Sequence, residues 1–139
     1  FGILNETYVK KLQIEARILG DMCLNHVIPA AVKYQNILIE NISGMKNIFG
    51  EEYVSLCQSE IRTLREISLY INNVSSDVHS LVEARKKANR VEDIALRAKM
   101  YSKDVKSMME KVRVSADNLE MLIDDEVWPL PKYRELLFF

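Results

Sequence analysis

Apolar residues recur every three or four positions along most of the chain, a spacing typical of α-helices that bury one face. In the middle of the chain the apolar stripe consists of Cys57, Ile61, Leu64, Ile67, Ile71, Val74, Val78 and Leu81. In the last third it consists of Ile94, Ala98, Tyr101, Val105, Met108, Val112, Ala116, Leu119 and Leu122. No stretch alternates apolar and polar residues for long enough to indicate a β-strand. The pattern predicts an all-α fold, a bundle of three to four long antiparallel amphipathic helices.

Glycine, proline and charge mark where these helices are expected to begin and end. Gly50 follows KNIF and precedes two acids, which suits the end of one helix and the start of the next. The two helices that follow would each have ~30 residues and form an antiparallel hairpin. The highly charged stretch EARKKANRVED, residues 83–93, is either an exposed tip between them or a place where helix runs on with little interruption. Pro129 and Pro131 are expected to end the last long helix.

The first helical pattern extends from Asn5 to about Phe49 and is interrupted by Pro29. Proline removes a backbone donor and crowds the preceding turn, so we expect a kink or break near residues 25–28. The surrounding sequence, LNHVIPAAVKYQNILIENI, is apolar on more than one side, which predicts a central position covered on several faces. Gly44 disfavours a helix by roughly 1 kcal/mol relative to alanine, and the close approach of another helix would explain its presence.

Composition and charge fit a single globular domain and exclude two classes of partner. Nineteen basic and 20 acidic residues among 139 give a formal charge of −1, so no basic face is expected to hold a nucleic acid or an anionic membrane. No apolar run approaches the ~20 residues that cross a bilayer. The N-terminal FGILNETYVKK has too short an apolar stretch for a secretory signal. Because the chain begins at Phe1 rather than at methionine, we expect either missing leading residues or a piece of a longer polypeptide.

Few side chains are placed for chemistry. Cys23 and Cys57 fall on apolar stripes, which favours small buried hydrophobes over a disulfide or a metal pair. Asp124, Asp125 and Glu126 are consecutive, and consecutive helical residues point in different directions, so a metal site there is disfavoured. The sequence has no Gly-rich phosphate loop, no HExxH motif and no suggestively spaced Ser/His/Asp set. We therefore assign no catalytic, cofactor-binding or metal-binding residue.

A group of polar residues lies close to the proline in the first helical pattern. His26 stands beside Asn25, and Tyr34, Gln35 and Asn36 follow one to two turns later. They form either a small buried polar site or a set of hydrogen bonds that stabilises the predicted kink. The second interpretation is favoured.

The last sixteen residues, DDEVWPLPKYRELLFF, do not have the composition of a solvated tail. Such tails are polar and rich in Gly and Ser, whereas this segment holds the only tryptophan of the chain and ends on four apolar residues. The composition predicts a segment that docks against another surface.

Three stretches resemble a known family. KKLQIEARILGDMCLNHVIPAAVKYQNILIENISGMKNIFG, EARKKAN and DDEVWPLPKYRELLF are similar to the C-terminal region of type III glutamine synthetases, the large form of bacteria and cyanobacteria. The similarity extends from about Tyr8 to Phe138. It implies a parent enzyme that joins ammonia to glutamate with ATP, with Mg²⁺ or Mn²⁺ neutralising phosphate charge. It also implies two stacked hexameric rings of subunits.

The resemblance places the metal, nucleotide and glutamate contacts in a β-rich region that would precede Phe1, so no catalytic residue is transferred to this sequence. The chain would be a structural and assembly domain in the cytoplasm, in contact with the catalytic region of its own chain and with neighbouring subunits. The docking segment would pack onto this bundle or onto a neighbouring subunit through Trp128, Leu130, Tyr133, Leu136, Leu137 and Phe138. The alternative is a stand-alone helical interaction module or small-ligand sensor without catalytic activity.

Overall fold

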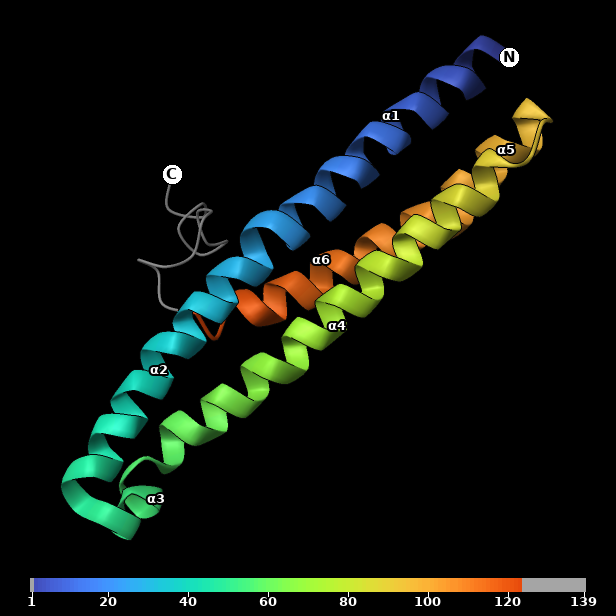
Figure 1. Cartoon of the computed structure of the whole chain (residues 1–139). Helices are drawn as coiled ribbons and strands as arrows, with labels where there is room; N and C mark the ends of the chain where they lie inside the picture. The colour runs from blue at the N-terminus through green and yellow to red at the C-terminus, as the bar shows by residue number, and fades with distance from the viewer. Residues whose placement is uncertain (1, 124–139) are drawn as a thin grey trace, which may run out of the picture.

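The computed structural model describes the backbone of residues 2–123 and the side chains of residues 5–123. Its α-helices are α1 (Gly2–Met22), α2 (Ile28–Phe49), α3 (Tyr53–Leu56), α4 (Gln58–Asn89), α5 (Ile94–Met100) and α6 (Lys106–Glu120). Figure 1 shows that α1 continues into α2, that α4 runs back alongside both, and that α5 and α6 return along α4. No strand occurs within residues 2–123, so the predicted all-α bundle is confirmed.

A π-helical turn, Cys23–Val27, joins α1 to α2 close to the predicted position of the kink. The N–H of Ile28 donates to the carbonyl oxygen of Cys23, five residues earlier. The wider turn gives room to the ring of Pro29, which has no N–H to donate. The helix therefore does not break at the proline. A second π-helical turn, Tyr101–Val105, joins α5 to α6 and was not predicted.

The ends of the helices follow the sequence signals at Gly50 and in the charged stretch. Gly50 ends α2 with a φ of 62°, a conformation that side chains disfavour. After a short 3₁₀ turn and α3, the chain reverses into α4. At the far end α4 continues to Asn89, and Asp93 caps α5 by accepting a hydrogen bond from the backbone N–H of Leu96. Of the two interpretations of residues 83–93, the exposed tip is correct, and it occupies only residues 90–93.

The core lies along the middle stripes, as their spacing predicts. Ile67, Val74, Val78 and Leu81 of α4 are buried, and α5, the second π turn and α6 contribute further buried side chains. The members of that second set are Ala98, Tyr101, Val105, Met109, Val112 and Leu119. Burying each large side chain contributes about 1.5–3 kcal/mol, so the helix pair is held mainly by this seam.

In the described part of the chain, α1, α4 and the α5–α6 segment pack together at one end of the bundle, which we call the three-helix end. At the other end α2 packs on α4 without α6, and we call this the two-helix end (Figure 1). The hydroxyl of Ser115 on α6 donates to the carboxylate of Asp77 on α4, and α6 ends five residues later at Glu120. The amide of Gln35 on α2 donates to the hydroxyl of Ser68 on α4 at 2.8 Å. Because α4 and α6 are antiparallel, α6 ends shortly before the level of this pair. Beyond it only α2 and α3 pack on α4 in the described part of the chain.

Two predictions are wrong: where the last long helix ends, and that α2 is covered on several faces. The last long helix ends at Glu120, well before Pro129, so the prolines do not end it. The second concerns α2, which is not central. Val27, Ala31 and Leu38 are buried in one stripe, but Val32, Ile37 and Ile39 are exposed because no other described element covers their side of the helix.

Candidate interaction surfaces

The described side chains do not assemble a catalytic or metal centre. Among residues 5–123 no group of three or more His, Cys, Asp and Glu side chains is placed to hold a metal ion. Within the same part of the chain, no helix has the length and apolarity needed to cross a membrane.

The polar residues near Pro29 do not gather into one site. His26 is exposed, and the amide of Asn25 donates to the carboxylate of Asp21 one turn earlier. Gln35 instead joins α2 to α4 through Ser68. The first bond spans the π-helical turn and the second sets the register of two helices, so these side chains support the helix and its packing without enclosing a pocket.

Cys23 and Cys57 are buried free thiols, which confirms their interpretation as small hydrophobes. Burial raises the pKa of the Cys23 thiol to about 11. Burial also raises the pKa of Cys57, and the nearby carboxylate of Glu60 adds to the effect. Both thiols are protonated at neutral pH and are poor nucleophiles.

A hydrogen-bonded junction connects three helices at the α4–α5 tip. The side-chain carbonyl of Asn89 accepts from the amide of Gln13 at 3.0 Å and from the hydroxyl of Tyr101 at 2.5 Å. The guanidinium of Arg97 donates to the carbonyl of Val91 at 2.8 Å. The junction satisfies the hydroxyl of a fully buried tyrosine and fixes the middle of α1, the end of α4 and the π-helical turn after α5 relative to one another.

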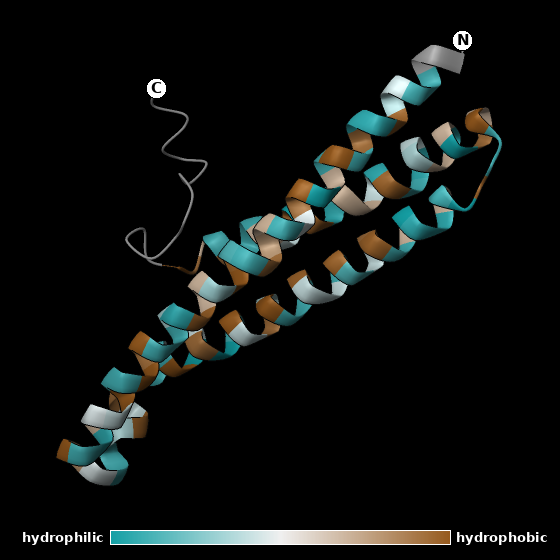
Figure 2. Ribbon diagram, turned by 45° about the horizontal axis from the view of Figure 1, so that its top comes forward, coloured by the Kyte–Doolittle hydropathy of each residue, from teal (hydrophilic) through white to brown (hydrophobic). Residues whose placement is uncertain are grey.

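The most apolar surface lies at the opposite end. Figure 2 shows hydrophobic residues along both ends of the bundle. At the two-helix end, fewer neighbouring helices are present to cover them. At the corner between α2 and α4, large apolar side chains reach solvent: Ile48, Phe49, Val54 and Leu56, which we call the corner patch. Exposed apolar residues gathered in this way are typical of an interaction site.

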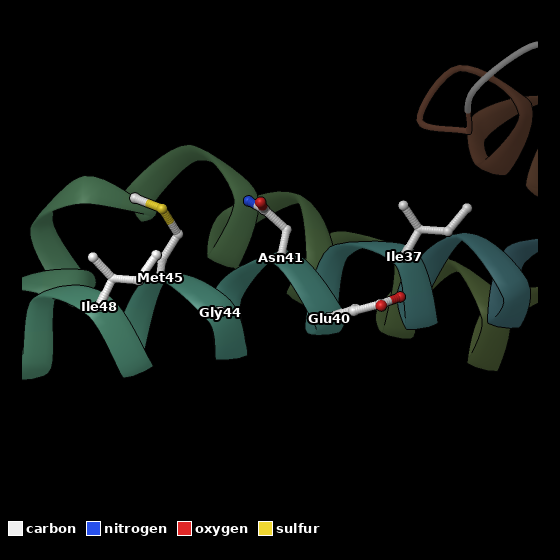
Figure 3. A pocket seen from close by; sticks show the side chains of 6 residues that line it. All are labelled: Ile37, Glu40, Asn41, Gly44, Met45 and Ile48. Atoms are coloured by element: carbon white, nitrogen blue, oxygen red, sulfur yellow. The ribbon is translucent and has the colours of Figure 1, made fainter.

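A groove on α2 borders the corner patch. It is lined by Ile37, Glu40, Asn41, Gly44, Met45 and Ile48, and we call it the α2 groove (Figure 3). Ile37 is 47% exposed and Ile48 is 75% exposed. A Cβ atom placed on Gly44 would meet no atom within 4 Å, so no described helix approaches this glycine, contrary to the prediction. Asn41 donates to the carboxylate of Glu60 on α4, which fixes one wall of the groove.

The apolar residues on a second side of α2 are the sequence signal for this surface. The two-sided apolarity of LNHVIPAAVKYQNILIENI predicts a helix covered on several faces, and only one of those faces is covered by the described chain. The predicted docking residues Trp128, Leu130, Tyr133, Leu136, Leu137 and Phe138 lie outside the described residues, as do Asp124, Asp125 and Glu126.

The described residues thus define an all-α bundle of amphipathic helices with apolar side chains exposed at one end. Comparisons with known proteins indicate the family. Residues 2–46, which comprise α1 and most of α2, match the model of the glutamine synthetase C-terminal domain. The resemblance to the C-terminal domain of type III glutamine synthetases is confirmed by this match and by the relatives described next.

The chain is 47% identical over 134 residues to a glutamine synthetase of Bacteroides fragilis (strain YCH46), a match that covers 96% of this chain and 18% of that protein. It is 29% identical over 140 residues to a type-3 glutamine synthetase of Dictyostelium discoideum, covering 98% of this chain and 19% of the relative. A glutamine synthetase of Butyrivibrio fibrisolvens is 26% identical over 138 residues, with 99% and 19% covered. The chain thus spans less than a fifth of the length of the curated relatives that it matches.

Proposed function

We propose that this chain is the C-terminal structural and assembly domain of a type III glutamine synthetase. The full enzyme would ligate ammonia to glutamate with hydrolysis of ATP in the cytoplasm. The domain would contact the catalytic region of its own chain and neighbouring subunits of a homo-oligomer of stacked hexameric rings. The observation that carries the proposal is the corner patch, which combines four exposed large apolar residues at the end of a bundle whose described residues form no catalytic cluster.

The exposed apolar area is sufficient to stabilise an assembly. Fully burying a leucine or phenylalanine side chain contributes about 1.5–3 kcal/mol, and the corner residues are roughly half exposed, so each would contribute about 1 kcal/mol on contact. Repeated in every subunit of an oligomer, contributions of this size decide whether neighbouring subunits remain associated. Phe49 also provides an aromatic anchor, a residue type that is frequent at the centre of interfaces.

The metals and nucleotide of such an enzyme do not fit the described residues. A Mg²⁺ or Mn²⁺ site needs several convergent oxygen ligands, and the acidic side chains of residues 5–123 are scattered along the outer faces of the helices. ATP would likewise need phosphate-binding groups that the sequence does not provide in any known loop motif. Both would bind elsewhere in the full enzyme, and no catalytic step is derived for this chain.

The C-terminal segment belongs to the same proposal as a docking element. Its apolar residues would add contact area between this bundle and its surroundings in the assembled enzyme. The residues expected to dock are Trp128, Leu130, Tyr133, Leu136, Leu137 and Phe138.

Two leucines with equal exposure provide a matched test of the corner patch. Leu56 lies in the patch and Leu96 lies at the opposite end of the bundle, and each is 47% exposed. In the full enzyme, Leu56→Lys should shift the oligomer toward smaller species in analytical ultracentrifugation and lower the glutamate- and ammonia-dependent release of ADP. Leu96→Lys should leave both unchanged. Equal oligomer size and activity in the two variants would contradict an assembly role for the corner.

A further inference from the structure

The α2 groove occupies the place where a third helix would continue. Residues seven apart lie nearly in line along a helix, and Ala30, Ile37 and Gly44 form such a line on α2. Ala30 is buried at the level where α6 ends, whereas Ile37 is half exposed and Gly44 has open space above its backbone. In Figure 3, the side chains of Ile37, Asn41, Met45 and Ile48 point to the side of α2 on which the end of α6 lies. The line that begins at the buried Ala30 therefore continues along the two-helix end, where no other described element covers it.

We propose that the α2 groove is the seat of the C-terminal segment, residues 124–139, of the same chain. The segment completes the bundle as a third layer beside α2 and α4, where α6 has ended. This inference names the partner surface of the docking segment and rests on its proposed docking role. It does not depend on the catalytic activity of the enzyme.

Chain length and the position of its last described residue favour this occupant. Ile123, the last described residue, is buried shortly after α6 ends, near the level of the Gln35–Ser68 pair and hence of Ile37, the first residue of the groove. The lining residues from Ile37 to Ile48 extend over roughly 16 Å of helix at 1.5 Å per residue. Sixteen residues span about 24 Å as a helix and about 50 Å when extended, so the segment reaches the whole groove in either conformation. Attachment at this level also gives it an effective concentration on the order of millimolar, which favours it over a second copy.

The chemistry of the two surfaces is complementary. The groove presents Ile37, Met45 and Ile48, and the segment supplies one tryptophan with several leucines and phenylalanines. Gly44 leaves the helix backbone open, so a flat aromatic ring can lie against it. Charge does not select this partner, because Glu40 of the groove is acidic and the segment holds four acids, at 124–126 and 135, against the two bases Lys132 and Arg134. Burial of the apolar side chains would dominate, because exposed ion pairs contribute little.

Thiol cross-linking in the full-length enzyme tests the seat directly. Gly44→Cys places a thiol in the groove without a clash, because a Cβ there has no neighbour within 4 Å. It is combined with Leu130→Cys, Tyr133→Cys or Leu137→Cys in turn, and treated with a short bis-maleimide. The control combines Leu96→Cys, on α5 at the opposite end of the bundle, with the same partners. The buried, protonated thiols of Cys23 and Cys57 contribute little background.

The expected result is a link within one chain for at least one Gly44→Cys pair and for no Leu96→Cys pair, shown by peptide mapping and by an unchanged subunit mass. A link between two chains would replace the proposal with a seat for a second copy. The absence of any link from Gly44→Cys, or equal linking from Leu96→Cys, would also overturn it.

A second variant gives an independent readout. Ile37→Lys and Met45→Lys together, which leave all four corner residues intact, should increase the rate of tryptic cleavage at Lys132 and Arg134 several-fold, while far-UV circular dichroism stays unchanged. Unaltered cleavage would contradict the seat. Oligomer size, measured on the same samples, separates this outcome from failure of the assembly role, because the corner residue Leu56 is intact in these variants.

Discussion

The junction at Asn89 leads to a quantitative prediction about the stability of the bundle. Asn89→Ala removes the acceptor of both the Tyr101 hydroxyl and the Gln13 amide. Gln13 is only partly buried and can bind water instead, whereas the tyrosine is 0% exposed. A buried hydroxyl without a partner costs about 1–3 kcal/mol. Alanine returns a few tenths of a kcal/mol through its higher helix propensity. We therefore expect the free energy of unfolding to fall by about 1–2 kcal/mol.

Urea unfolding of the 139-residue chain, followed by circular dichroism, measures this change. With a slope of about 1–3 kcal/mol/M for small proteins, the midpoint should fall by roughly 0.3–2 M. The same substitution in a Tyr101→Phe background supplies the control, because no hydroxyl is then left without a partner. There Asn89→Ala should cost less than about 0.5 kcal/mol. An equal cost in both backgrounds would refute the reasoning, since the loss would then not arise from the buried hydroxyl.

Two further predictions concern the backbone and the thiols. Gly50→Ala should lower stability by about 1–3 kcal/mol because Gly50 has a φ of 62°. Gly20→Ala, in the regular helix α1, should raise stability by up to about 1 kcal/mol, because its Cβ would make only an ordinary contact with Val78 at 3.7 Å. Thermal unfolding of the two variants checks the contrast, and a similar loss in both would contradict it. Because the folded pKa of Cys23 is raised to about 11, the thiol is ionised only in the unfolded chain between about pH 9 and 11, so stability should fall as the pH rises through that window. Cys23→Ala should show a shallower fall in urea midpoint over that range, and an equal slope would show that the thiol does not contribute.

Much of the fold could be predicted because the spacing of apolar residues is a local property. The stripe through Ile67, Val74 and Leu81 indicates a helix with one buried face, and the structure buries these residues. Gly50 was recognisable as a helix end because few other residues accept its conformation. Pro29 marked an irregularity at the correct place. Its form, a π-helical turn without a break, depends on how the flanking turns pack and could not be predicted from the proline alone.

The candidate interaction surfaces could not be predicted from the sequence. Apolar residues on a second side of a helix indicate that something covers that side, but they do not say whether the cover comes from the same chain. For Val32, Ile37 and Ile39 we predicted an internal cover, and the described chain provides none. The corner patch was missed for the same reason. Phe49, Val54 and Leu56 come together only when the chain reverses at Gly50.

The sequence by itself determined that the chain is helical, where its first helix is irregular, which residues form the central seam, and that its two cysteines are small buried hydrophobes. These properties follow from periodicity and from the conformational limits of single residues. Only the tertiary structure decided that α6 ends partway along the bundle and leaves the groove on α2 open. It also decided that Asn89 joins three helices. Both depend on the register between helices, which is set by packing and hydrogen bonds between residues far apart in the chain, such as Ser115 with Asp77 and Gln13 with Asn89.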